Sequence, residues 1–146
     1  MSRINKTLII LKPDCLERKL TASCLDILLN VGIIRKLKYH TVSSDEILRH
    51  YSDNLINSDD SIKKRVLDYF VNKEIIIIIL EGPDIIKKVR RLVGESDPSL
   101  SSKETIRGRF GIDSYKQADI ENRSCRNIIH ASDSQTTFEY EKSIWF

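Results

Sequence analysis

Short runs of apolar residues alternate along the chain with stretches in which apolar positions have helical spacing. The runs at Lys6–Lys12, Ile33–Val42 and Glu74–Leu80 predict three strands, and the third contains five successive isoleucines. An unbroken apolar run of this kind is typical of a strand that is covered on both faces. A fourth and shorter strand is predicted at Asn127–Ile129.

Apolar side chains between these strands recur every three or four residues, which indicates helices with one buried face. The stripe from Leu20 to Val31 stops at Gly32, a residue type that often follows a helix C-terminus. Residues 96–126 show little periodicity, so we expect a long functional loop there. Further helices are predicted from Ser43 to about Tyr51, at Ile62–Phe70, after Gly82-Pro83-Asp84 and after Ser132-Asp133-Ser134.

This order of elements predicts an α+β fold. We expect a ferredoxin-like split βαβ arrangement, in which a four-stranded antiparallel sheet carries helices packed on one face. The sequence has no internal repeat, no low-complexity segment and no linker that would divide it. Residues 1–146 are therefore predicted to form a single domain.

Composition narrows the classes of function. The 146 residues are 40% hydrophobic and 31% charged, which is ordinary for a globular protein. The apolar run Ile75–Leu80 is too short to span a membrane, and no signal peptide is recognisable. Three cysteines without metal-ligand spacing favour a reducing, cytoplasmic location. A net charge of +3 suits small anionic substrates and makes nucleic acid an unlikely partner.

The strongest chemical signal is His130, which follows the short strand Asn127–Ile129. Ser132, three residues before Gln135, has the spacing of a capping box and predicts the start of a helix. In that helix Glu141 shares a face with two large aromatic residues, where an unpaired charge is costly. Its most economical partner is His130, and such a pair suits a nucleophile or proton carrier. The alternative interpretation is a structural histidine in the core, with its hydrogen-bonding groups paired, and a glutamate that faces solvent.

Further polar residues stand at the ends of the predicted elements. Taken singly, each has an ordinary structural explanation as a solvated charge, a packing tyrosine or a turn former. Taken together with His130, they supply three cations, hydroxyl groups and an amide, which suits a polyphosphate and a ribose. These residues are Lys12, Tyr51, Arg90, Ser96, Arg107 and Asn127.

Five motifs occur in the order in which they occur in nucleoside diphosphate kinases, and the sequence resembles that family from Thr7 to Phe146. The histidine motif is the most specific of the five. The motifs are Lys12-Pro13-Asp14, Glu81-Gly82, Gly94-Glu95-Ser96-Asp97-Pro98, Ile106-Arg107-Gly108 and Asn127-Ile128-Ile129-His130-Ala131-Ser132-Asp133-Ser134.

The resemblance implies a ping-pong kinase in which His130 takes the γ-phosphate of a nucleoside triphosphate and passes it to a nucleoside diphosphate. Glu141 and Ser132 would orient the imidazole. Mg²⁺ would arrive with the nucleotide, held by phosphates and water and not by protein ligands. Arg90, Arg107 and Ser96 would bind phosphates, Tyr51 the transferring group, and Lys12 and Asn127 the ribose, with Lys12 also near the moving phosphate.

The sequence also departs from the family pattern. The segment Asn57–Ser61 lacks the aromatic residue that usually stacks on the base, for which Tyr69, Phe70 or Tyr115 could substitute. The segment Asp113–Arg126 is longer than usual. The family implies a homo-oligomer, a hexamer or tetramer, which we expect to be weakened because the chain ends at Trp145-Phe146.

Two other classes of function are open at this point. A catalytically inactive nucleotide-binding or scaffold relative would keep the fold. Absence of His130, Lys12 or either arginine would favour such a relative, but all of these residues are present. A nucleic-acid-binding module would use a basic stripe interleaved with exposed aromatic residues. The basic cluster at residues 87–91, on a helix, is better explained as framing a phosphate site or facing solvent.

Overall fold

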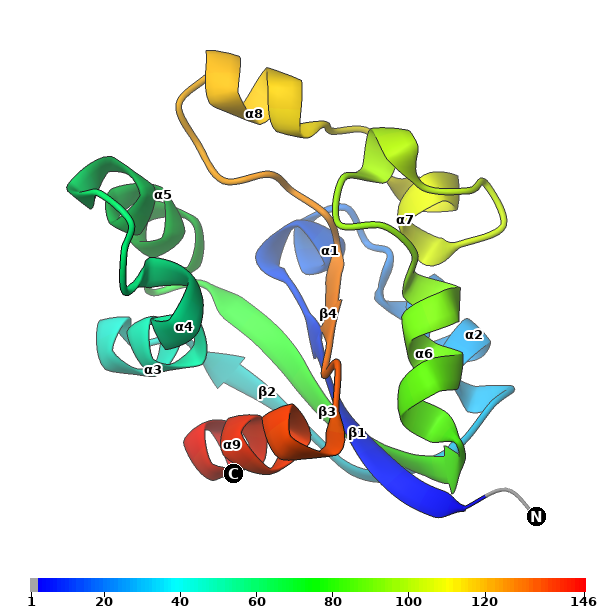
Figure 1. Ribbon diagram of the computed structural model, residues 1–146. Coiled ribbons are helices and arrows are strands. Elements are labelled where there is room, and N and C mark those ends of the chain that lie inside the picture. Colours follow the sequence, from blue (N-terminus) through cyan, green and yellow to red (C-terminus); the bar gives the residue numbers. More distant parts are fainter. Residues whose placement is uncertain (1–2) are drawn as a thin grey trace.

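The structure, a computed structural model, describes residues 3–146 and contains a four-stranded antiparallel sheet (Figure 1). The strands lie in the order β2-β3-β1-β4. This is the strand order of a split βαβ sandwich, so the predicted α+β, ferredoxin-like class is confirmed. The bounds are Ile4–Leu11 for β1, Ile33–Thr41 for β2, Glu74–Pro83 for β3 and Ile129–Ala131 for β4.

Helices occupy all the segments in which helices were predicted, and four short ones, α1, α4, α7 and α8, were not predicted. None of the helices among residues 3–146 is long and apolar enough to cross a membrane. They are α1 Pro13–Glu17, α2 Thr21–Leu29, α3 Ser44–His50, α4 Ser52–Leu55, α5 Asp60–Phe70, α6 Ile85–Val93, α7 Ile106–Phe110, α8 Tyr115–Ile120 and α9 Gln135–Trp145.

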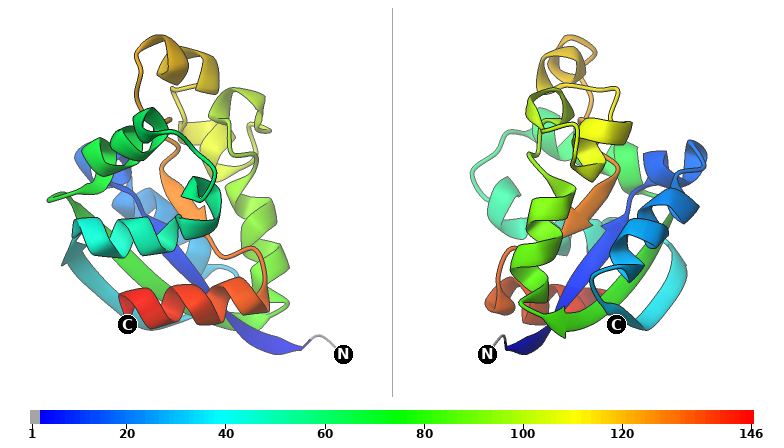
Figure 2. Two further views of the ribbon diagram at one scale, coloured as in Figure 1. Left: turned by 60° about the vertical axis from the view of Figure 1, so that its left-hand side comes forward. Right: turned by 90° about the vertical axis from the view of Figure 1, so that its right-hand side faces the viewer.

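Helices cover both faces of the sheet, so the prediction of helices on one face was wrong (Figure 2). Ile9 and Leu11 of β1 belong to a core with α1, α2 and α6, whereas Leu8 and Ile10 belong to a second core with α3, α5 and α9. Successive strand residues point to opposite faces. Because β1 and β3 are apolar at almost every position, each face needs its own cover.

The predicted loop at residues 96–126 is also corrected, because it contains a 3₁₀ turn at Pro98–Leu100 and the helices α7 and α8. These helices have five and six residues, too few to produce a recognisable apolar stripe. Each begins at a side-chain cap: Thr105 accepts a hydrogen bond from Gly108 N, and Ser114 accepts one from Gln117 N, both at 3.0 Å.

The last strand and the cap of the last helix both lie two residues later than predicted. Strand β4 is Ile129–Ala131, so His130 is its central residue. Ser134, and not Ser132, caps α9 by accepting a hydrogen bond from Thr137 N at 3.0 Å. Ser132 does not serve as the cap, because its hydroxyl turns into the core and donates to Glu141 Oε1 at 2.6 Å.

Candidate active site

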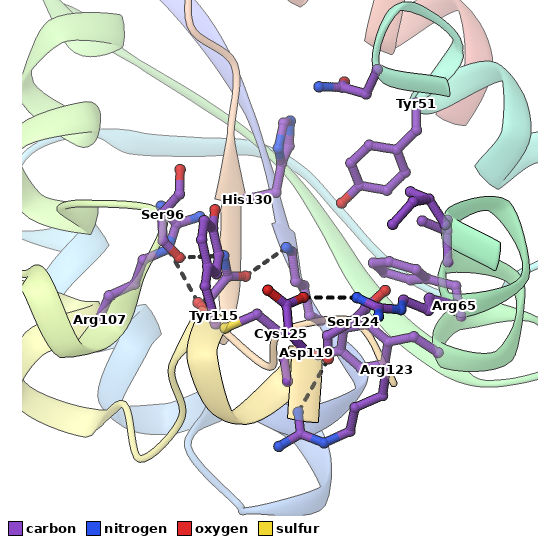
Figure 3. Close-up of a pocket in the computed structure, with 18 of the residues that line it drawn as sticks. Tyr51, Arg65, Ser96, Arg107, Tyr115, Asp119, Arg123, Ser124, Cys125 and His130 are labelled. Atoms are coloured by element: carbon purple, nitrogen blue, oxygen red, sulfur yellow. Dashed lines mark hydrogen bonds and ion pairs between the residues drawn. The ribbon is translucent and has the colours of Figure 1, made fainter. Parts of the chain in front are cut away.

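A pocket of about 530 Å³ opens where β1 and β4 meet α5, α7 and α8 (Figure 3). All but two of the predicted site residues line this pocket, although they come from six different parts of the chain. The two exceptions, Ser132 and Glu141, are buried behind His130. The predicted residues in the lining are Lys12, Tyr51, Arg90, Ser96, Arg107, Asn127 and His130.

His130 is held by one of its two ring nitrogens. Its Nε2 lies 2.7 Å from Glu141 Oε2, and the other carboxylate oxygen accepts a hydrogen bond from Ser132 Oγ at 2.6 Å. Glu141 is only 3% exposed and Ser132 is fully buried. Nδ1 of His130 has no hydrogen-bond partner within residues 3–146, so it is the nitrogen that can react.

The electrostatic surroundings favour the neutral form of His130. Burial, followed by the positive charges of Lys12, Arg107 and Arg90, lowers the pKa of His130 to about 3. Burial raises the pKa of Glu141, although its contacts with His50 and Ser132 oppose this. In a neutral ring whose Nε2–H donates to a carboxylate, the lone pair is on Nδ1. This is the protonation state that a histidine nucleophile needs.

The backbone before His130 is strained. Ile128 has a φ of 76°, in the left-handed region that β-branched residues rarely adopt. Its N–H donates to Asp14 Oδ2 at 3.1 Å, and its carbonyl accepts from Lys12 N at 2.8 Å. Strain of this kind costs about 1–3 kcal/mol and persists only where the surroundings fix it. The kink separates Asn127 from the strand and lets Asn127 and His130 line the same pocket.

Lys12, Asn127 and Ser96 form one connected group beside His130. Lys12 Nζ donates to Asn127 Oδ1 at 2.6 Å, and Asn127 Nδ2 donates to Ser96 O at 2.9 Å. Lys12 is only 7% exposed. Burial, together with the nearby charge of Arg107, lowers the pKa of Lys12 to about 7. An anionic ligand in the pocket would restore the full charge of this lysine.

The two arginines differ in how firmly they are held. Arg107 donates to the carbonyls of Asn127 at 3.2 Å, Gly94 at 3.2 Å and Ile129 at 2.6 Å. A guanidinium has five N–H groups, so two are left for a ligand. Arg90 is exposed and makes one long hydrogen bond, from Nη1 to Ala131 O at 3.3 Å. The structure thus places at the same pocket one cation held by three hydrogen bonds and one exposed cation held by a single hydrogen bond.

The contact between α5 and α8 that closes the outer wall of the pocket was not anticipated from the sequence. Arg65 of α5 reaches across to α8, where it contacts Asp119 Oδ1 at 2.9 Å and Asn122 Oδ1 at 3.0 Å (Figure 3). Tyr115, at the start of α8, also lines the pocket, and its N–H donates to Asp97 Oδ2 at 3.3 Å. The extra segment Asp113–Arg126 therefore builds one side of the cavity.

A further histidine beside the site, the buried His50, was also missed. Its ring lies 4.6 Å from the ring of His130, centroid to centroid, and its Nε2 lies 3.8 Å from Glu141 Oε2. A sequence signal existed, because Ile47, His50 and Tyr51 share the inward face of a helix at helical spacing. In residues 3–146, His50, His130 and Glu141 are the one group of His, Cys, Asp and Glu side chains close enough together to hold a metal ion.

A histidine with one ring nitrogen held and the other free, next to several cations, can accept a phosphoryl group and pass it on. A pocket that continues beyond these cations between two helices has room for a sugar and a base. The class that this fold and pocket define is therefore a phosphotransferase that acts on nucleotides.

Comparison with known proteins identifies the family. The family model for nucleoside diphosphate kinase matches residues 5–146, and the chain belongs to this family. A nucleoside diphosphate kinase from Thermoplasma acidophilum is 33% identical over 142 residues, which cover 97% of this chain and 87% of the relative. One from Clostridium perfringens is 30% identical over 145 residues, covering 99% and 92%.

Solved structures agree with this assignment. The chain superposes with a TM-score of 0.91 on a nucleoside diphosphate kinase from Borrelia burgdorferi, described as a transition state mimic with bound vanadate and ADP. The two are 29% identical, and the match covers 98% of this chain and 87% of the other. For an NDP kinase from Pyrobaculum aerophilum the TM-score is 0.87 at 30% identity, covering 99% and 96%.

Proposed function

We propose that this chain, acting as a single domain, is a nucleoside diphosphate kinase that transfers the γ-phosphate between nucleotides through a phosphohistidine at His130. Membership of the family supports the activity. The observation that carries the assignment of the nucleophile is the 2.7 Å contact between His130 Nε2 and Glu141, which leaves Nδ1 free beside the cations of the pocket. An inactive relative is not favoured, because the residues whose loss would indicate one, His130, Lys12 and both arginines, are all present.

The reaction consists of two half-reactions at one site. His130 Nδ1 attacks the γ-phosphorus of the donor, the bond from that phosphorus to the β–γ bridging oxygen breaks, and a nucleoside diphosphate leaves. The phosphorylated ring keeps its Nε2–H and carries a positive charge, which the Glu141 carboxylate offsets. A terminal phosphate oxygen of a second diphosphate then attacks the phosphorus of the phosphohistidine, the bond from that phosphorus to Nδ1 breaks, and His130 returns to its neutral form.

The other pocket residues bind and orient the nucleotide. Arg90, Arg107 and the hydroxyl of Ser96 bind the distal phosphates, where positive charge matters most in phosphoryl transfer. Tyr51 donates a hydrogen bond to the transferring group; burial raises the pKa of Tyr51, so its hydroxyl stays protonated. Lys12 and Asn127, already joined at 2.6 Å, contact the ribose, and Lys12 also lies close to the moving phosphate. Ser132 acts from behind, through Glu141.

We also propose that Mg²⁺ binds together with the nucleotide and supplies charge neutralisation on the phosphates. The chemistry of the pocket suits this arrangement. Its lining carboxylate, Asp119, is paired with Arg65 at 2.9 Å, and Glu141 lies behind His130. Phosphate oxygens and water, and not side chains of this protein, would therefore coordinate the ion.

For its assembly and location we propose a homo-oligomer, a hexamer or tetramer, in the cytoplasm. The family membership supports the assembly, and the three free cysteines support a reducing compartment. Analytical ultracentrifugation tests the assembly: a single monomeric species at micromolar concentration would contradict it.

Steady-state kinetics tests the two-step reaction. Initial rates are measured for ATP as donor and a deoxynucleoside diphosphate as acceptor, each varied at several fixed concentrations of the other. The proposal predicts parallel lines in double-reciprocal plots, because the first product leaves before the second substrate binds. Intersecting lines would indicate direct transfer between two bound nucleotides and would contradict a phosphoenzyme.

A further inference from the structure

His50 is a buried titratable residue that the mechanism above does not use. It is the last residue of α3, and its side chain is only 2% exposed. It touches three groups that matter for the site or its support: the ring of His130 at 4.6 Å, the Glu141 carboxylate at 3.8 Å and the indole of Trp145. A polar ring at this depth needs partners, and each partner constrains what the ring can do.

The contact with Trp145 fixes the tautomer of His50. Trp145 Nε1 lies 3.0 Å from His50 Nδ1, and an indole nitrogen can only donate, so Nδ1 must be the acceptor. Burial and the neighbouring His130 lower the pKa of His50 to about 3, so the ring is neutral at physiological pH. A neutral ring that accepts at Nδ1 carries its proton on Nε2, the nitrogen nearest to Glu141.

We propose that His50 is a positioning residue for phosphoryl transfer: its Nε2–H, fixed by Trp145, holds the Glu141 carboxylate in place against His130. The inference rests on the proposed function of His130. His50 supports Glu141 Oε2 from one side, while Ser132 binds Oε1 at 2.6 Å. The carboxylate is thereby kept from turning away from His130 Nε2.

The neutrality of His50 is part of this role. A second positive charge 3.8 Å from Glu141 would share the carboxylate with the imidazole of His130. The negative charge would then be less available when the phosphorylated ring becomes positive. A neutral N–H donor orients the carboxylate without neutralising it. The Trp145–His50 bond, entirely within the core, excludes the tautomer with its lone pair facing Glu141.

Two substitutions at His50 separate its two contacts. In His50→Asn the amide oxygen takes the place of Nδ1 and can still accept from Trp145, but no group reaches Glu141. In His50→Gln the longer side chain places its amide where Nε2 was and still presents an N–H to Glu141. The rate of phosphoenzyme formation is measured by rapid quench with γ-labelled ATP, together with kcat and KM.

For His50→Asn we expect kcat to fall about tenfold with an unchanged KM, because the lost N–H contact acts through the Glu141 carboxylate and not on the nucleotide. His50→Gln should retain kcat within about threefold of the wild type. In a Glu141→Gln background, His50→Asn should change kcat by less than about twofold, because the group through which it acts is already altered.

Each alternative outcome overturns the inference. Equal losses of kcat in the Asn and Gln variants would indicate packing alone, and a raised KM would indicate contact with the nucleotide. Additive effects of His50→Asn and Glu141→Gln would show that His50 acts by another route. If thermal melting shows that His50→Asn is unfolded, Trp145→Phe replaces it, because this variant keeps His50 and removes the donor that fixes its tautomer. An unchanged kcat in Trp145→Phe would then contradict the role.

The test also keeps the two proposals apart. A wild-type protein that forms no phosphoenzyme refutes the proposed function itself. If the wild-type protein forms the phosphoenzyme and the His50→Asn variant has the same kcat as the wild type, only the positioning role is refuted.

Discussion

A Glu141→Gln variant keeps the shape of the side chain and removes its charge. In the wild type, Oε2 pairs with the N–H of His130 at 2.7 Å and Oε1 accepts from Ser132 at 2.6 Å. Both partners are donors, so the carboxylate needs acceptors at both positions. A glutamine offers one acceptor and one NH₂ group, and one of the two partners must then face a donor.

The size of the effect follows from these contacts. A hydrogen bond to a charged group is worth about 1.5–3 kcal/mol, and a neutral one about 0.5–1.5 kcal/mol. The Glu141 bonds lie in a water-excluded setting, with the residue 3% exposed, and the bond to His130 strengthens as the ring becomes positive. We therefore expect a loss of about 1.4–2.8 kcal/mol in the transition state, or ten- to a hundredfold in rate.

A coupled assay of diphosphate release measures this loss. Both kcat and kcat/KM should fall together while KM stays constant, since the interaction serves the transition state. Glu139→Gln is the matched control, because Glu139 lies on the same helix with its side chain 58% exposed. A Glu141→Gln enzyme with a kcat within twofold of the wild type, or with a changed KM alone, would refute the reasoning.

Three further predictions concern binding. Because burial lowers the pKa of Lys12 to about 7, its amine is mostly neutral at pH 8, and ADP binding should draw in protons. Calorimetry in two buffers of different ionisation enthalpy measures this uptake, and Lys12→Arg, always charged, should show none. ATP, GTP, CTP and UTP should all act as donors with kcat/KM within about tenfold, about 1.4 kcal/mol; a thousandfold preference would contradict this. Arg65→Ala, compared with Lys64→Ala, should raise the KM for nucleotides and spare kcat, because it releases α8 from α5. A lower kcat at unchanged KM in Arg65→Ala would contradict the prediction that this side of the pocket contributes only to nucleotide binding.

Apolar patterning predicted most of the fold. The unbroken runs that form β1 and β3 identified the centre of the sheet, and helical stripes located α2, α5 and α6. The same runs imply two covered faces, an implication that the one-face prediction overlooked. The helices α7 and α8 could not be predicted from periodicity, because helices of five or six residues complete fewer than two turns.

The site was predictable where residue type and motif coincided. His130, Glu141 and the cations were predicted as site residues because a carboxylate on an aromatic face needs a partner and because the motifs resemble the family. The Arg65–Asp119 contact was not predictable, since it joins residues 54 positions apart across a segment of unusual length. The strain at Ile128 also gave no signal, because isoleucine gives no indication of a positive φ.

The central claim is that the phosphoryl group passes through His130. The wild-type protein is incubated with γ-labelled ATP, split between acid and alkali, and then chased with a different nucleoside diphosphate. We expect an acid-labile label on His130 that moves completely to the added diphosphate, and no label on a His130→Ala variant. A label that resists acid, lies on another residue or persists in His130→Ala would contradict the account.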